Sequence, residues 1–523
     1  MSADRLDGLT SWHADWRGLR VAVLGLGMTG FSVADTLAEL GCEVLVVAGR
    51  PDDDRERILQ VLGVPVVIAA DQDEVPERLR EFGAELVVAS PGYPPHHALH
   101  RWAAEAGLPV WGDIELAWRL RDKTGAPSRW LLVTGTNGKT TTTQLAASMV
   151  AAGGLRVAPA GNIGIPVLDA VRDPIGYDVL VVEISSYQLH FTSTVSPEAS
   201  VVLNIAPDHL DWHGSFEAYR DAKGRAYERT RIACVYNVAD EATMRLVEEA
   251  DVVEGCRAIG FGTDVPRVSE LGVVDGVLVD RAFLDERRHS ALELTTVEAL
   301  RERGLSARHL VEDVLAAAAL ARAIGVEPAA IRAAIDGFRT DRHRNELVAD
   351  RDGVLWVDDS KATNLHAADA SLGAYRSVVW IVGGLLKGVD IAPLVERHAD
   401  RLRAAVVIGR ERAEVLAAFA QHAPAVPLVE IDAGETERVM PRAVAEAGAL
   451  VASGDTVLLA PAAASMDQFA SYEDRGEQFA AAVLARMRRS TDAQAHADDD
   501  RDGLEPGRDE RGAHDGGADA PGA

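Results

Sequence analysis

Short apolar runs alternate along the chain with stretches in which apolar and polar residues have helical spacing. The runs have the length and the β-branched content of buried strands. Near the N-terminus they occupy residues 19–24, 42–47, 65–70, 86–89 and 109–111. Residues 31–40 read as a helix that stops at Gly41. Because strands that alternate with helices form parallel sheets, this part of the chain is predicted to be an α/β unit ending near Gly112.

The alternation continues in two further units. Predicted strands of the second lie at residues 130–133, 179–184 and 199–205, and residues 304–325 are mainly an alanine-rich helix. Predicted strands of the third lie at residues 354–357, 377–382, 404–408, 428–431 and 456–460. We expect an α/β fold with a first unit over residues 1–112, a second over 113–340 and a third over 341–489.

Residues 490–523 have a different composition. They contain ten Asp or Glu residues against three Arg, a net charge of −7, with almost no large apolar side chain. Such a segment cannot bury enough apolar surface to fold, so it is predicted to be a disordered, solvated tail.

The bulk composition limits the possible functions. With 523 residues the chain is too long for a single core, and its net charge of −28 argues against a nucleic-acid partner. Cys42, Cys234 and Cys256 lack the spacing of a metal site or a disulfide framework, which fits a reducing compartment. No signal peptide and no apolar window of the ~18 residues that a membrane span needs is present, so a cytoplasmic protein is predicted.

A predicted strand leads directly into the loop TGTNGKTTT at residues 134–142. Its glycines allow backbone N–H groups to face phosphate oxygens, Lys139 can reach the β- and γ-phosphates, and Thr140 can bind Mg²⁺. Val133 stands where the strict eight-residue pattern has glycine, so the loop is a shortened variant. An ordinary strand-to-helix turn is the alternative, but it would not need lysine followed by hydroxyls.

The first unit carries GLGMTG at residues 25–30 after a predicted strand. This pattern suggests nucleotide binding, but Ala48 stands where a dinucleotide site has an acid for the ribose. A nucleotide of another kind is therefore plausible, with Arg50 near its base or phosphates. Ser90 follows another strand at the same sheet edge, where a structural turn is the alternative.

Polar residues also end strands of the second unit. Glu183 closes a buried strand and must be paired or metal-bound, and Mg²⁺ is the natural partner beside a phosphate loop. His209 lies in a predicted loop rather than on an apolar helical face, which favours function over a core histidine. Lys223, on charge alone, would be a surface lysine.

In the third unit, three strand ends are polar: DDSKATN at residues 358–364, GGLLKG at 383–388 and APAAASMDQF at 460–469. Because the carboxyl ends of parallel strands meet at one sheet edge, these segments are predicted to form one site. Their lysines and hydroxyls suit a carboxylate substrate.

Several of these segments together resemble the Mur ligases of bacterial peptidoglycan synthesis. The resemblance covers residues 15–488 and rests on residues 135–140, Glu183 with 185–186, 208–211, 343–344 and 359–364. Residues 25–30, 161–164 and 359–364 resemble the branch that adds D-glutamate. The resemblance implies a Rossmann-like N-terminal domain that binds a UDP-substrate, a central P-loop ATPase-like domain and a Rossmann-like C-terminal domain that binds an amino acid.

The resemblance also implies a reaction. ATP phosphorylates the carboxylate of UDP-N-acetylmuramoyl-L-alanine, and the amine of D-glutamate attacks the acyl phosphate to form an amide. Lys139 and two Mg²⁺ ions neutralise the charge of phosphoryl transfer. The expected enzyme takes part in cytoplasmic precursor synthesis, has no membrane insertion, and needs no more than a monomer.

Residue roles follow from the same resemblance. ATP is expected to contact Gly135, Thr136, Asn137, Gly138, Lys139, Thr140, Thr141, Arg344 and Asp359. The metal ions are expected to contact Thr140, Glu183, His209 and a carbamylated Lys223, and the catalytic residues are Lys139, Glu183, His209 and Lys223. Thr29, Arg50 and Ser90 match UDP contacts, and Asn162 and Ser185, with His209, match contacts to the rest of that substrate. Lys361, Thr363, Lys387, Ser465, Met466 and Tyr472 match the D-glutamate pocket.

The chain departs from the family at five positions. Ala48 and Gly49 stand where some relatives have Asp and Thr for uracil recognition. Leu310 and Asp313 replace two asparagines at the adenine side, and Ala463 replaces a frequent cysteine. The phosphates of ATP are still expected to bind, whereas contacts to the two bases are expected to differ.

Three other functions compete with this interpretation. A sister Mur ligase adding another amino acid would carry different residues at 360–364. A nicotinamide oxidoreductase would use residues 25–30 but would not need the second phosphate loop. A non-catalytic nucleotide-binding switch protein would not need three polar strand ends in a third unit.

Overall fold

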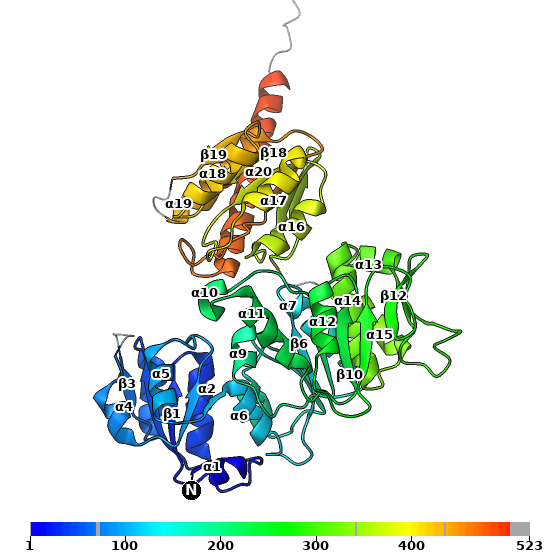
Figure 1. The fold of residues 1–523 in the computed structure, drawn as a ribbon. Helices are drawn as coiled ribbons and strands as arrows, with labels where there is room; N and C mark the ends of the chain where they lie inside the picture. Colours follow the sequence, from blue (N-terminus) through cyan, green and yellow to red (C-terminus); the bar gives the residue numbers. More distant parts are fainter. Residues whose placement is uncertain (1, 70–73, 340–341, 433–435, 503–523) are drawn as a thin grey trace, which may run out of the picture.

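The computed structural model describes residues 2–69, 74–339, 342–432 and 436–502, and it contains three β-sheets (Figure 1). The first sheet is parallel, in the order β3-β2-β1-β4-β5. Its strands are β1 (Arg20–Leu24), β2 (Glu43–Ala48), β3 (Val66–Ile68), β4 (Leu86–Ala89) and β5 (Val110–Gly112). Its helices are α1 (Ser2–Asp7), α2 (Met28–Glu39), α3 (Asp53–Val61), α4 (Glu77–Phe82) and α5 (Ala98–Glu105). The central strands are buried on both faces, which explains their continuous apolar runs.

The second sheet has nine strands in the order β14-β13-β12-β11-β10-β9-β6-β8-β7. They are β6 (Arg129–Thr134), β7 (Val157–Gly161), β8 (Val179–Glu183), β9 (Ala199–Val202), β10 (Ala233–Asn237), β11 (Arg257–Phe261), β12 (Glu270–Val274), β13 (Val277–Asp280) and β14 (Leu292–Thr296). The sheet is parallel from β7 to β12, and β13 and β14 extend it antiparallel. The sequence did not predict β7 or β10 to β14, because several are short and carry polar or charged residues.

Helices of the second unit are α6 (Asp113–Leu120), α7 (Lys139–Ala152), α8 (Val167–Arg172), α9 (Ser186–His190), α10 (Leu210–His213), α11 (Phe216–Gly224), η1 (Arg225–Tyr227), α12 (Glu241–Glu248), α13 (Val297–Glu302), α14 (Arg308–Ala323) and α15 (Pro328–Gly337). The alanine-rich helix α14 packs on α7, which follows the phosphate loop. Its small side chains allow this close packing, and its buried face forms much of the core.

The third sheet has the order β15-β16-β20-β17-β18-β19, with only β15 antiparallel to its neighbour. Its strands are β15 (Glu346–Arg351), β16 (Val354–Asp358), β17 (Val378–Val382), β18 (Leu402–Val407), β19 (Leu428–Glu430) and β20 (Thr456–Leu459). Its helices are α16 (Leu365–Gly373), α17 (Ala392–His398), η2 (Ala399–Arg401), α18 (Ala413–His422), α19 (Thr436–Leu450) and α20 (Tyr472–Asp502). The strands β16, β20 and β17, which precede the three polar segments, are neighbours.

Helix α20 extends into the start of the predicted acidic tail. It continues through residues 490–502, the first part of the segment predicted to be disordered. Propagation of an existing helix needs no new nucleus, and the start of α20 packs on α19 and the third sheet. The remainder of the predicted tail, residues 503–523, lies outside the described part of the chain.

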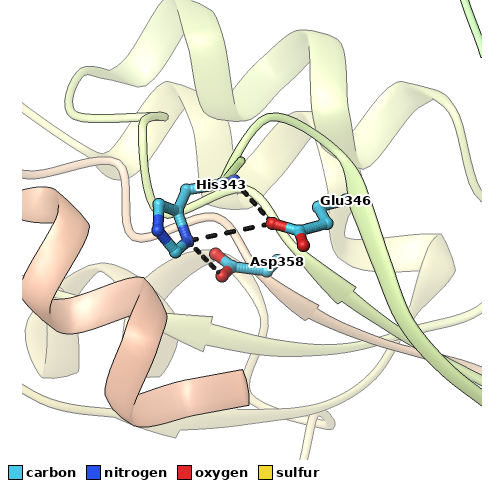
Figure 2. A group of neighbouring side chains, drawn as sticks. All are labelled: His343, Glu346 and Asp358. Atoms are coloured by element: carbon cyan, nitrogen blue, oxygen red, sulfur yellow. Dashed lines mark hydrogen bonds and ion pairs between the residues drawn. The ribbon is translucent and has the colours of Figure 1, made fainter. Parts of the chain in front are cut away.

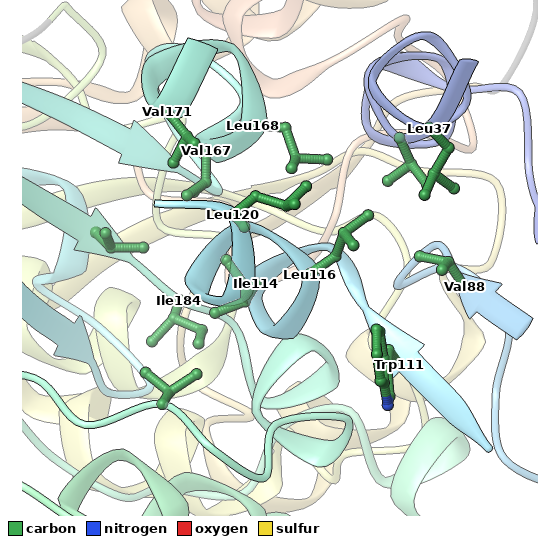
Figure 3. Packing of buried hydrophobic residues seen from close by; sticks show 14 of the residues in the cluster. Leu37, Val88, Trp111, Ile114, Leu116, Leu120, Val167, Leu168, Val171 and Ile184 are labelled. Atoms are coloured by element: carbon green, nitrogen blue, oxygen red, sulfur yellow. The ribbon is translucent and has the colours of Figure 1, made fainter. Parts of the chain in front are cut away.

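The first and second units share a hydrophobic core. Leu37 of α2 and Val88 of β4 belong to the same buried cluster as Leu116 of α6, Leu168 of α8 and Ile184 (Figure 3). The buried clusters of the third unit contain residues of that unit alone. Figure 1 shows the first and third units apart from each other, each beside the second. Across the described ranges, no helix is long and apolar enough to cross a membrane. The boundaries at residues 112, 340 and 489 remain predictions.

Candidate active site

The phosphate loop connects β6 to α7 with two glycines in conformations that other residues rarely adopt. Gly135 has φ +153° and Gly138 has φ +82°. A Cβ atom at Gly138 would lie 2.2 Å from Oδ1 of Asp313 on α14, and the positive φ would strain any other residue, so glycine is favoured here. The Thr136 hydroxyl accepts a hydrogen bond from the Ala206 N–H at 2.9 Å, which ties the loop to the neighbouring strand end. The loop therefore has a defined shape.

Lys139 lies over this loop. Its Nζ donates hydrogen bonds to the carbonyl oxygens of Gly135 and Thr136, both at 2.9 Å. Burial lowers the pKa of Lys139, while Glu183 and Asp208 oppose this shift. Lys139 is thus a half-buried cation at the cavity whose partners are backbone carbonyls of the loop itself.

A cavity of about 660 Å³ is lined by residues of both the second and third units. It brings together most of the residues predicted to contact ATP, metal ions and D-glutamate, and also Asn162, which is predicted to contact the UDP-substrate. Those in its lining are Thr136, Asn137, Gly138, Lys139, Thr140, Thr141, Asn162, Glu183, His209, Arg344, Asp359, Lys361, Thr363 and Lys387. A nucleotide and a second substrate can therefore meet in one space.

Glu183 ends strand β8 and is 1% exposed. Its Oε1 accepts a hydrogen bond from the Asn162 side chain at 2.8 Å. Its buried Oε2 has no hydrogen-bond partner in the described part of the chain. An unpaired buried carboxylate oxygen is costly, and coordination to a divalent cation would remove this cost. With Thr140 in the same cavity lining, these residues fit a magnesium ion.

His209 has the left-handed φ of 54° and lines the cavity between two partners. Its Nδ1 is hydrogen-bonded to the Tyr187 hydroxyl, and its Nε2 lies 3.6 Å from Oδ2 of Asp208. Burial lowers the pKa of His209 to about 4, although Asp208 opposes the shift. The imidazole is therefore neutral near pH 7, the form that binds metal ions.

Lys223 is buried, and the prediction of a surface lysine is wrong. It is 2% exposed on α11, and its Nζ donates to the Gly135 carbonyl at 2.8 Å and to the Thr134 hydroxyl at 3.3 Å. Burial, with a further contribution from Lys139, lowers its pKa well below the usual value. The sequence contained one indication of this burial, because Tyr219 lies four residues earlier and is on the same buried helical face as Lys223.

The third unit contributes two lysines to the cavity. Lys361 follows β16, and its Nζ lies 3.6 Å from the ring centre of Tyr472. Burial lowers the pKa of Lys361 to about 8, and Arg344 adds to the shift. Lys387 follows β17, and its Nζ lies 3.5 Å from Oδ1 of Asp208 in the second unit.

Two amides also join the third unit to the phosphate loop. The Asn364 side chain donates to Oδ1 of Asn137 at 3.0 Å, and Asn137 Nδ2 lies 2.9 Å from Nδ1 of His366. Asn364 is also the N-cap residue of α16, so its contact brings the start of that helix to the second unit. The two units therefore meet through polar groups at the cavity.

Arg344 lines the cavity. The short connection that carries it is held by three titratable side chains, which Figure 2 shows. His343 Nδ1 lies 2.7 Å from Oδ2 of Asp358, and the His343 N–H donates to Glu346 Oε2 at 2.8 Å. These three side chains are close enough together to hold a metal ion, but their hydrogen bonds account for the arrangement. They fix the backbone on which Arg344 is presented.

Asp359 lies beside this connection. Its Oδ1 accepts from the Asn345 N–H at 3.3 Å, and its Oδ2 accepts from the Ser371 hydroxyl. Burial raises the pKa of Asp359 to about 6. Asp359 thus links the connection to helix α16 while it lines the cavity.

Other predicted site residues lie outside the cavity lining. Thr29, Arg50 and Ser90 are at the carboxyl edge of the first sheet, where a Cβ atom at Gly25 would lie 2.6 Å from Ser90 Oγ. Ser185 caps α9 through a reciprocal pair of hydrogen bonds with Gln188. Gly135, Lys223, Ser465, Met466 and Tyr472 are also outside it, and Met466 is 77% exposed.

Sequence reasoning did not assign roles to several groups that the structure brings to the site. Asp208 and Asn364 were part of recognised segments, yet only their contacts across the cavity show what they join. Tyr187 and Tyr219 had no signal beyond their spacing, because their partners His209 and Thr136 are distant in sequence.

Comparisons with known proteins identify the family of two regions of the chain. The family model for the Mur ligase middle domain matches residues 133–321, and that for the Mur ligase, glutamate ligase domain matches residues 343–463. A solved structure, the MurF ligase from Thermotoga maritima in complex with ADP, has a TM-score of 0.50 at 18% identity, covering 90% of this chain and 96% of that one. This likeness concerns the fold.

Two relatives are much closer in sequence. The chain is 64% identical over 493 residues to a protein of Leifsonia xyli subsp. xyli, covering 92% of this chain and 95% of that protein. It is 54% identical over 473 residues to one of Streptomyces avermitilis, covering 90% and 98%. Both are named UDP-N-acetylmuramoylalanine--D-glutamate ligase.

The fold and the two matched regions define a Mur ligase, and the chain belongs to that family. At this identity over most of its length, it falls within the group of UDP-N-acetylmuramoylalanine--D-glutamate ligases. The predicted fold class and family are confirmed.

Proposed function

We propose that the protein is an ATP-dependent amide ligase that adds D-glutamate to UDP-N-acetylmuramoyl-L-alanine. The observation that carries the proposal is the shared cavity, in which the phosphate loop with Lys139 faces Lys361 and Lys387 from another unit. A generic ATPase needs the loop but does not need two cations from a separate sheet. The names of the close relatives supply the choice of substrates.

The reaction proceeds in two steps. The γ-phosphoryl group of ATP passes to a carboxylate oxygen of the L-alanyl group, and ADP leaves. The amine nitrogen of D-glutamate then attacks the acyl carbon, phosphate leaves, and the nitrogen loses a proton to form the amide. Lys139, supported by Arg344, offsets the negative charge as two anions approach each other.

Two magnesium ions fit this chemistry. Thr140 and Glu183 would hold one, and His209 with a carbamylated Lys223 would hold the other. The bound ions would supply charge neutralisation at the phosphoryl group. The buried, unpaired Oε2 of Glu183 and the lowered pKa of Lys223 support this assignment, because a neutral amine reacts with carbon dioxide.

The residues predicted to bind the UDP end lie outside the cavity lining, so the substrate would have to be elongated. The UDP end would bind at Thr29, Arg50 and Ser90, and the alanyl end would lie near Asn162 and His209, with Ser185 nearby. ATP would contact Gly135, Thr136, Asn137, Gly138, Lys139, Thr140, Thr141, Arg344 and Asp359. D-Glutamate would bind among Lys361, Thr363, Lys387, Ser465, Met466 and Tyr472.

Phosphate release from ATP tests the proposal. The protein is assayed with UDP-N-acetylmuramoyl-L-alanine and with D-glutamate, L-glutamate, L-alanine or a diamino acid in turn. Release that depends on D-glutamate and on the UDP-substrate supports the proposed function. Release that is indifferent to the amino acid, or specific for another one, refutes it.

A further inference from the structure

Arg475 is a wholly buried arginine at the start of α20, with 0% of its surface exposed. Its guanidinium donates three hydrogen bonds: from Nε to Ser360 Oγ at 2.9 Å, and from its two terminal nitrogens to the carbonyls of Ser360 at 2.8 Å and Ala463 at 3.1 Å. All three acceptors are neutral. Burial of a charged side chain is costly unless its donors are hydrogen-bonded. The three hydrogen bonds offset part of that cost and fix the position of the guanidinium.

Two carboxylates act on the charge of Arg475, and both have other hydrogen-bond partners. Asp467 accepts a hydrogen bond from the Arg410 N–H at 2.8 Å, and Asp358 is paired with His343 at 2.7 Å. These carboxylates favour the charged guanidinium, but burial is the larger effect and lowers the pKa of Arg475 to about 10. The side chain is therefore still a cation near pH 7.

The three contacts of Arg475 join segments that are distant in sequence. Ser360 precedes Lys361 on the loop after β16, and Ala463 lies two residues before Ser465 on the loop after β20. The Ser360 hydroxyl also donates to the carbonyl oxygen of Tyr472 at 2.8 Å. One planar guanidinium thus sets the spacing of both loops and of the first residue of α20.

These same segments carry the proposed amino-acid pocket. Lys361 and Tyr472 are in contact with each other, and Ser465 lies on the second loop. The guanidinium has donors in a fixed fork, so it can hold two loops at once, whereas a lysine offers a single charged nitrogen.

We propose that Arg475 is a positioning residue for the amino-acid substrate. It holds Lys361, Ser465 and Tyr472 at the spacing that a dicarboxylic amino acid requires, and it does not touch the substrate. This inference rests on the proposed function. It predicts a selective role in binding D-glutamate, distinct from general stabilisation of the third unit.

Two variants and one control test it. Arg475→Lys keeps the charge but loses the fork, and Ser360→Ala removes one acceptor with little change in volume. Arg486→Lys is the matched control, because Arg486 is on the same helix and donates to the Gly448 carbonyl at 2.8 Å, away from the cavity. KM is measured for D-glutamate, ATP and the UDP-substrate, together with kcat and the melting temperature.

The expected result is selective. KM for D-glutamate rises about tenfold in Arg475→Lys and about threefold in Ser360→Ala, while KM for the other two substrates changes less than about twofold. Arg486→Lys leaves all three constants near those of the unsubstituted protein. If Arg475→Lys does not fold, Ser360→Ala alone decides the result.

A different pattern overturns the inference. A lower melting temperature or kcat with an unchanged KM for D-glutamate in the variants would mean that Arg475 is only structural, as would an equal rise in all three KM values. Failure of the unsubstituted protein to use D-glutamate would instead refute the proposed function, and the two failures are distinguishable because only one needs a substitution.

Discussion

Lys387 Nζ lies 3.5 Å from Asp208 Oδ1, and this ion pair joins the third unit to the second at the cavity that both residues line. Burial opposes ionisation of Asp208, but the neighbouring His209 side chain and the positive charges of Lys387 and Lys139 lower its pKa. The backbone of Lys387 is left-handed, with φ 55°, so the chain turns at this residue in the segment after β17. The pKa of Asp208 in the second unit therefore depends on the position of Lys387 in the third unit.

Replacement of Lys387 by Met should lower kcat/KM at least about tenfold, or ~1.4 kcal/mol. The substitution removes a cation from the site and a contact between two units. Lys387→Arg should retain more activity because it keeps the charge. Lys123→Met is the control, since Lys123 pairs with Glu39 far from the cavity. Steady-state kinetics would contradict this prediction if Lys387→Met matched the unsubstituted enzyme.

Gly138→Ala should abolish measurable binding of an ATP analogue and lower stability by about 1–3 kcal/mol. The new methyl group would meet the Asp313 carboxyl group, and the residue would keep a left-handed backbone. Gly63→Ala is the control, because Gly63 has φ +75° and open space around it. Calorimetric titration and thermal unfolding give the two quantities. Equal effects of both substitutions would show that backbone strain, rather than the contact with Asp313, is responsible.

Lys223→Ala should abolish ligase activity, and high bicarbonate should not restore it. The variant lacks the amine that carbon dioxide would modify and the hydrogen bond to the Gly135 carbonyl. A small carboxylic acid is expected to restore part of the activity by replacing the carbamate oxygen atoms. Carbon NMR with labelled bicarbonate gives an independent readout, since the carbamate signal should be present in the unsubstituted protein and absent in Lys223→Ala. Full activity in this variant would refute the assignment.

Binding of D-glutamate should weaken as the pH rises through about 8. Burial lowers the pKa of Lys361 to about 8, so its cation is present below that pH and is lost above it. A carboxylate bound by Lys361 loses its partner in that interval, and the dissociation constant rises. Lys361→Met should bind weakly at all pH values and lack this dependence. Calorimetric titration across the interval measures both; the same pH profile in the variant would assign the effect to another group.

Local patterns were sufficient for much of the fold. The apolar runs that became β1, β6, β8, β16 and β17 were recognisable because buried parallel strands are continuously apolar. The strands β12 to β14 were missed because their mixed composition makes sense only beside the strands that they pair with. The helix over residues 490–502 was missed because its support comes from the preceding part of α20, while its composition favours disorder.

The sequence by itself determined the class of protein. Residues 134–142 specify a phosphate loop through the backbone freedom of their glycines and the chemistry of Lys139. These residues are adjacent in the chain, so the loop is recognisable without the fold. Polar residues after successive strands indicated a shared edge, and β16, β20 and β17 are indeed neighbours. The detailed roles of the site residues remain predictions.

Tertiary structure alone decided which distant groups meet. Only the fold buries Lys223 against the phosphate loop, pairs Lys387 with Asp208, and places the guanidinium of Arg475 between two loops. The physical reason is that burial, and with it the pKa and the hydrogen-bond partners of a side chain, depends on what packs around it. Lys223, which its charge alone would assign to the surface, is buried because it packs against the phosphate loop.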